Sequence, residues 1–99
     1  MADYFWPEDG QRLGERARRA WGETVAAFPV GAPFVGEVIG RRRFGVFIRI
    51  DGAPDAVGLA EIYAMPRDVE LPAMGARVTG EVISHAEHNH QVKVRLQPW

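Results

Sequence analysis

The chain has 99 residues, a formal net charge of −1 and no cysteine. Its length suits a single domain with a modest core, and the lack of cysteine excludes a disulfide framework and a thiolate metal site. Hydrophobic residues make up 46% and charged residues 25%, which is typical of a globular protein, and a chain so close to neutral binds nucleic acid only where positive charge is locally concentrated.

The amino terminus does not resemble a signal peptide. Residues 1–8 lack the basic start and the apolar stretch of a signal peptide, and no apolar run in the chain is long enough to cross a bilayer. We therefore expect a cytoplasmic protein with no membrane contact.

Residues 7–28 are predicted to form one helix. Pro7 is tolerated in a first turn, and Pro29 ends the helix because the residue before a proline is disfavoured in the α conformation. Side chains suited to packing recur at three- and four-residue steps, namely Leu13, Ala17, Ala20, Trp21, Thr24, Val25 and Phe28. We expect residues 1–29 to be a helical extension that packs by this side on the remaining domain, residues 30–99.

From Gly31 onward the hydrophobic period is two, and glycine and proline become frequent, which predicts short strands. The expected strands lie near residues 34–40, 44–51, 56–59, 77–84 and 91–96, with one short helical turn at 60–64 and an irregular loop through residue 72. The pattern around Gly36 recurs around Gly80, which is typical of glycine in the middle of two strongly curved strands. This order predicts a mainly β protein, a five-stranded OB-fold Greek-key barrel.

The segment that begins at Arg41 carries the clearest functional pattern. Its sequence is Arg41-Arg42-Arg43-Phe44-Gly45-Val46-Phe47-Ile48-Arg49-Ile50. Strand alternation places Phe47 and Arg49 outward, and an irregularity at Gly45 would bring Phe44 to the same surface. Exposed rings beside guanidinium groups are typical of single-stranded nucleic-acid binding. Three alternatives remain open: Phe44 is core, Phe47 lies under the amino-terminal helix, or the three arginines form an ordinary solvated loop.

Residues from about Val30 to Leu96 also resemble the S1 RNA-binding domain family. The matching segments are Gly31, Gly36-Glu37-Val38, Phe44-Gly45-Val46-Phe47-Ile48, Gly58-Leu59-Ala60-Glu61-Ile62, and Gly75 with Val78 and Val82. The resemblance implies an OB-fold barrel whose two aromatic RNA contacts are matched by Phe44 and Phe47. Glu61 stands where the family usually has a histidine, and residues 85–90 depart from the family's pattern. A carboxylate at position 61 repels phosphate but accepts hydrogen bonds from base amino groups.

These features predict a small protein that binds single-stranded RNA with weak sequence preference. The expected contact residues are Phe44, Phe47, Arg41, Arg42, Arg43, Arg49, Tyr63, Lys93 and Arg95. We expect neither catalytic residues nor a cofactor, because the chain lacks a nucleophile motif and a phosphate loop. His85, His88 and His90 are expected to be solvent-exposed at a hairpin tip rather than metal ligands.

A protein-interaction module on a diverged S1-like barrel is the alternative. Glu61, the small net charge and the aromatic segment Tyr4-Phe5-Trp6 favour this alternative, because aromatic residues often anchor interfaces. The sequence identifies neither the RNA, the protein partner nor the oligomeric state.

Overall fold

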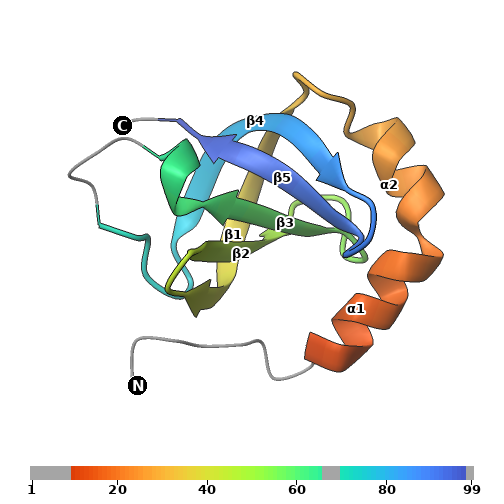
Figure 1. Ribbon diagram of the computed structural model, residues 1–99, viewed down its shortest axis with the longest axis horizontal. Helices are drawn as coiled ribbons and strands as arrows, with labels where there is room; N and C mark the ends of the chain where they lie inside the picture. The colour runs from red at the N-terminus through yellow and green to blue at the C-terminus, as the bar shows by residue number, and fades with distance from the viewer. Residues whose placement is uncertain (1–9, 66–69, 98–99) are drawn as a thin grey trace.

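Five strands form a closed barrel in a computed structural model of the protein, which describes residues 10–65 and 70–97 (Figure 1). The elements in chain order are α1 (Gly10–Arg19), α2 (Trp21–Ala27), β1 (Pro33–Arg42), β2 (Gly45–Ile50), β3 (Val57–Glu61), the 3₁₀ turn η1 (Ile62–Ala64), β4 (Arg77–Ala86) and β5 (Gln91–Leu96). The predicted strands and the helical turn between the third and fourth strands are therefore present. None of the helices in the described ranges is long and apolar enough to span a membrane.

The strands follow the order β1-β2-β3-β5-β4, and β4 pairs with β1 to close the barrel. All neighbours are antiparallel except β3 and β5, which are parallel. A parallel pair needs a long crossover connection. Here the connection from β3 to β5 contains η1, the loop after it and β4. This is the Greek-key arrangement of the OB-fold, and it confirms the predicted fold.

Residues of all five strands fill the barrel interior, and the alternation is clearest in β2 and β5. Val46, Ile48 and Ile50 are at most 1% exposed, as are the inward residues of β5, namely Val92, Val94 and Leu96. Burial of each such side chain contributes roughly 1.5–3 kcal/mol relative to an exposed position. The two-residue periodicity of these strands therefore predicted the core correctly.

Gly36 and Gly80 occupy equivalent places in β1 and β4. A Cβ atom at Gly36 would lie 2.5 Å from the carbonyl oxygen of Arg49, and one at Gly80 would collide with the carbonyl oxygen of Arg95. Each glycine thus lets a neighbouring strand approach more closely than a side chain would permit. The internal repeat predicted that Gly36 and Gly80 have similar environments, and this prediction is confirmed.

The predicted single helix is two helices that meet at Ala20, and residues 7–9 of the prediction lie outside the described ranges. The change of direction lets the helices pack on different parts of the barrel. Leu13 and Ala17 of α1 contact its outer wall, whereas Trp21 and Phe28 pack against the barrel core.

The expected exposure of the histidines is wrong for two of the three. Because β4 extends to Ala86, His85 lies within the strand, and its Nε2 is 2.8 Å from the carbonyl oxygen of Phe28. The indole of Trp21 meets the rings of His85 and His90 edge to face, at centroid distances of 6.1 and 5.6 Å. Only His88 is exposed. The β4–β5 hairpin therefore supports α2.

Candidate nucleic-acid interface

Phe44 lies in the turn between β1 and β2, with 46% of its surface exposed. The strand begins one residue later than predicted, so strand alternation does not direct this ring into the core. Its ring meets that of Phe47 at a centroid distance of 6.1 Å and an interplanar angle of 87°. The two rings therefore reach one side of the barrel, and the alternative that Phe44 is a core residue is wrong.

The backbone next to Phe44 is fixed by close contact with the end of β3. The amide of Ile62 donates a hydrogen bond of 2.7 Å to the carbonyl oxygen of Phe44, and Gly45 pairs with Glu61. A Cβ atom at Gly45 would lie 2.9 Å from the Cα atom of Glu61, closer than such atoms approach. Glycine at position 45 therefore lets the turn that carries Phe44 approach the end of β3 closely.

Phe47 is buried, at 4% exposure, so the prediction that its ring is open to solvent is wrong. It faces away from the barrel core, as alternation predicted, but Leu13 and Ala17 of α1 pack over it. The same apolar cluster contains Ile39, Val57 and Leu59 from three neighbouring strands. The alternative that the amino-terminal helix covers Phe47 is therefore correct, through Leu13 and Ala17 rather than Trp21 and Phe28.

Glu61 contacts two of the predicted contact residues, Tyr63 and Lys93. Its Oε1 accepts a 2.6 Å hydrogen bond from the Tyr63 hydroxyl and lies 2.7 Å from Nζ of Lys93. Hydrogen bonds from Lys93 and Tyr63 lower the pKa of Glu61, and the same carboxylate raises the pKa of Lys93 and of Tyr63. Glu61 therefore offsets the positive charge of Lys93, while Tyr63 remains 70% exposed.

The five predicted arginines have different environments. Arg41 donates to the carbonyl oxygens of Pro72, at 3.1 Å, and Leu71, at 3.3 Å, so it fastens the loop before β4. Arg95 pairs with Glu81 at 3.4 Å. Arg42 and Arg43 are exposed at the turn that carries Phe44. Arg49 is also exposed, four residues along β2 from Gly45, which corresponds to about 13 Å.

One surface therefore contains most of the predicted contact residues. We call it the Phe44 surface and define it by Arg42, Arg43, Phe44, Glu61, Ile62, Tyr63 and Lys93. It lies where the β1–β2 turn approaches η1, at the end of the barrel away from α2 (Figure 1). Arg41, Phe47, Arg49 and Arg95 lie outside it.

Two members of the Phe44 surface were missed as contact residues. Ile62 is 55% exposed although its residue type is usually buried. Glu61 was noted as a departure from the family, but its contact with Lys93 was not expected. That contact depends on the parallel pairing of Leu59 with Lys93 between β3 and β5, which periodicity within one strand does not reveal.

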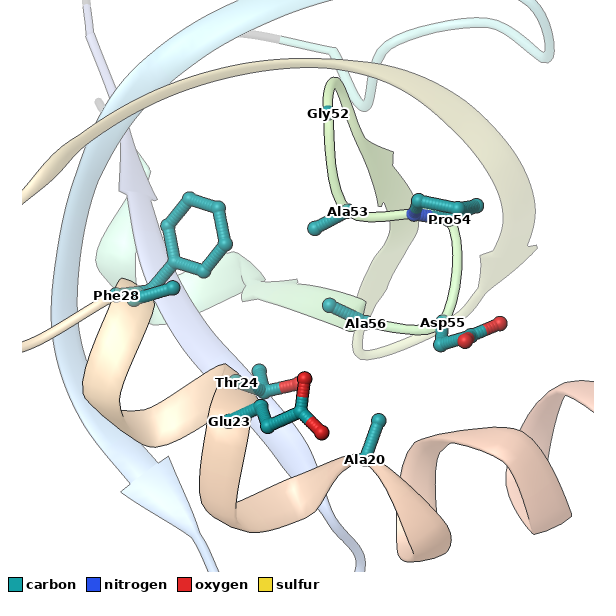
Figure 2. A pocket seen from close by; sticks show the side chains of 10 residues that line it. Ala20, Glu23, Thr24, Phe28, Gly52, Ala53, Pro54, Asp55 and Ala56 are labelled. Atoms are coloured by element: carbon teal, nitrogen blue, oxygen red, sulfur yellow. The ribbon is translucent and has the colours of Figure 1, made fainter.

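A pocket of about 260 Å³ lies at the opposite end, between α2 and the β2–β3 loop (Figure 2). Its charged lining side chains are the carboxylates of Glu23 and Asp55, and the rest of the lining includes Thr24 and Phe28. Asp55 also pairs with Arg16 of α1 at 3.4 Å. Because carboxylates repel phosphate, this pocket is a poor site for a nucleic-acid backbone.

Comparison with known proteins identifies the fold through solved structures. No family model matches the chain, and no curated protein matches it. Apo RNase R from Mycoplasma genitalium has a TM-score of 0.68 and 18% identity over 84% of this chain, which corresponds to 15% of RNase R. RNase R from the same organism in complex with ribose-methylated single-stranded RNA has a TM-score of 0.67 and 16% identity over 81% of this chain and 15% of that chain.

The solution structure of GSP13 from Bacillus subtilis is also similar. It has a TM-score of 0.54 and 27% identity, over 71% of this chain and 55% of GSP13. This chain therefore spans only a small part of RNase R and about half of GSP13. Together with the barrel topology, these similarities define the protein as an S1-like OB-fold barrel.

Proposed function

We propose that the protein binds single-stranded RNA through the Phe44 surface, with weak sequence preference overall. The observation that carries this proposal is the half-exposed ring of Phe44 on the same turn as the exposed side chains of Arg42 and Arg43. The ring of Phe44 meets Phe47 but remains 46% exposed, and a ring beside guanidinium groups suits a base and its phosphate. RNase R, of which 15% is similar to this chain, has been solved in complex with ribose-methylated single-stranded RNA, and this complex supports the proposal.

Each part of the surface has a distinct role in this proposal. A base stacks on the Phe44 ring, and a second base stacks on Tyr63, each stacking interaction contributing roughly 1–3 kcal/mol. Arg42 and Arg43 contact the phosphates next to the stacked base. Lys93 contributes less because Glu61 offsets its charge. The protein acts by binding and not by catalysis.

Helix α1 covers part of the barrel wall and so limits the size of the interface. Because Leu13 and Ala17 occupy the outer wall over Phe47, RNA contacts the barrel at the end that carries Phe44. Two or three phosphate contacts give a slope of about −1.4 to −2.1 in a plot of log affinity against log salt concentration. The affinity is therefore modest and depends only moderately on salt.

A fluorescence anisotropy titration tests this proposal. A labelled single-stranded RNA of about six nucleotides is titrated with protein at about 50 mM and about 200 mM salt. We expect measurable binding at the lower concentration, with the stated slope, and weaker binding of a duplex of the same sequence. No binding at the lower concentration, or a preference for the duplex, would refute the proposal.

A protein-interaction module is the second candidate, and the exposed side chain of Ile62 favours it. Ile62 is 55% exposed beside Phe44 and Tyr63, so the surface offers apolar area that a protein partner could cover. Affinity capture from a lysate treated with nuclease separates the two candidates. Partners that disappear with the RNA support RNA binding, whereas partners that persist and are lost on Ile62→Asp substitution support a protein interface.

A further inference from the structure

We propose that Glu61 makes the Phe44 surface select guanine over uracil at the nucleotide that stacks on Phe44. This inference rests on the proposed function and identifies the chemical class of base that the site prefers. It concerns one nucleotide position, so it is compatible with weak preference elsewhere along the RNA.

Within the described residues, one oxygen of the Glu61 carboxylate, Oε2, has no hydrogen-bond donor. An ionised carboxylate offers about four lone-pair sites, two on each oxygen. Oε1 already receives the Tyr63 hydroxyl and Lys93 Nζ, at 2.6 and 2.7 Å. No side chain in the described part of the protein donates to Oε2. The side chain is 23% exposed, so a ligand has access to it.

Tyr63 and Lys93 also hold the carboxylate in its charged, acceptor-only form. Their hydrogen bonds lower the pKa of Glu61 below its ordinary value of 4.5. At neutral pH the group therefore accepts hydrogen bonds and donates none. Because two neighbours fix one of its oxygens, little side-chain freedom remains to be lost when a base binds.

The position of Glu61 relative to Phe44 suits the edge of a stacked base. Glu61 pairs directly with Gly45, which follows Phe44 and has no side chain to separate them. Phe47 follows Gly45 by two residues on β2, so Glu61 and Phe47 lie on the same outward face of the sheet. The ring of Phe44 meets that of Phe47. In this proposal, the Watson–Crick edge of a base stacked on Phe44 lies against the Glu61 carboxylate.

The four bases differ in what that edge offers. Guanine has two adjacent donors, N1–H and the N2 amino group, which both suit a carboxylate. Uracil has one donor between two carbonyl oxygens, and these oxygens are repelled by the negative charge. Adenine and cytosine each have one amino donor next to an acceptor nitrogen. The expected order of affinity is guanine, then adenine and cytosine, then uracil.

The test compares three RNA pentamers in anisotropy titrations at about 50 mM salt. One is all uridine, the second has guanosine at its centre, and the third has inosine there, which lacks the N2 amino group. We expect the guanosine pentamer to bind at least about tenfold more tightly than the uridine pentamer, with inosine between them. This comparison uses the unaltered protein, so it does not depend on the folding of a variant.

Glu61→Gln and Glu81→Gln then identify the residue responsible. Glu81 is a matched control because it also lies on a strand and pairs with a cation, Arg95, at 3.4 Å. We expect Glu61→Gln to reduce the guanosine preference to less than about threefold, whereas Glu81→Gln keeps it. Equal binding of the pentamers, or an unchanged preference in Glu61→Gln, would overturn the inference and leave RNA binding intact. No binding of any pentamer would instead refute the proposed function.

Discussion

The rings of Phe44 and Phe47 meet edge to face at a centroid distance of 6.1 Å, yet Phe44 is 46% exposed and Phe47 only 4%. An edge-to-face pair stabilises both partners by about 0.5–1.5 kcal/mol beyond their buried area. Phe47 therefore supports the ring of Phe44 from beneath, while α1 covers Phe47. The two residues that the sequence paired as RNA contacts have separate roles.

Substitution of Phe44 should weaken RNA binding with a limited loss of stability. We expect Phe44→Ala to weaken RNA binding about 5- to 150-fold, because it removes one stacked base. The free energy of unfolding should fall by about 1–3 kcal/mol, through the lost ring contact and the lost burial of about half of the side chain. Anisotropy titration and urea denaturation measure the two effects. A large loss of stability with unchanged RNA affinity would contradict the roles assigned here.

Substitution of Phe47 should affect stability more than RNA binding. Phe47→Ala leaves a cavity beneath α1 and should lower the free energy of unfolding by about 3–5 kcal/mol. RNA affinity, measured at a temperature where the variant remains folded, should fall less than in Phe44→Ala. If Phe47→Ala abolished binding without loss of stability, α1 would have to leave the barrel before RNA binds.

Gly45→Ala should be strongly destabilising, because the new methyl group would meet the backbone of Ala60 and Glu61. Overpacking of this kind costs about 1–3 kcal/mol. Gly22→Ala is the matched control, since Gly22 is exposed on α2 with nothing within 4 Å of the new atom. That substitution should stabilise the protein by about 0.5–1 kcal/mol through helix propensity. Thermal unfolding of the two variants distinguishes the effects, and a loss of similar size in both would contradict this account.

The Glu61–Lys93 pair makes the free energy of unfolding depend on pH, with a definite sign at each end of the pH range. Because the pKa of Glu61 is lowered in the folded protein, its contribution is fully present above 4.5 and is lost as pH falls through the folded value. The pKa of Lys93 is raised, so its contribution is present below 10.5 and is lost as pH rises through the folded value.

The difference in unfolding free energy between the unaltered protein and Glu61→Gln reports on this pair. It should be constant around neutral pH and should shrink as pH falls below 4.5. Urea denaturation across this range measures it. A difference that grows in acid would contradict the stabilising role of the charged carboxylate.

Much of the barrel was predictable because inward apolar residues recur at every second position of β2 and β5, as Ile48 and Val94 illustrate. The candidate site was predictable only in part. Phe44 lies outside β2, so alternation did not apply to it, and the burial of Phe47 depends on where Leu13 docks, which no local pattern specifies. The link between Glu61 and Lys93 likewise required the order of the strands in the barrel.

Arg41 and Arg43 should differ although both belong to the arginine cluster. Arg41→Gln removes the hydrogen bonds to Leu71 and Pro72, so the amide of Gly75, which donates to Val38 at 2.9 Å, should exchange with solvent faster. Arg43→Gln should leave this exchange unchanged and weaken RNA binding, with a salt slope smaller in magnitude by about 0.7. Hydrogen exchange and anisotropy titration measure the two variants. Equal loss of RNA affinity in both would contradict the different roles.

An amide chemical-shift titration of the labelled protein with a short single-stranded RNA tests RNA binding at the Phe44 surface most directly. We expect the largest shifts at Phe44 and Gly45 and along residues 61–63, with little change at Glu23 and Asp55 around the opposite pocket. Absence of shifts at high RNA concentration, or shifts centred on the Glu23 and Asp55 end, would contradict RNA binding at the Phe44 surface.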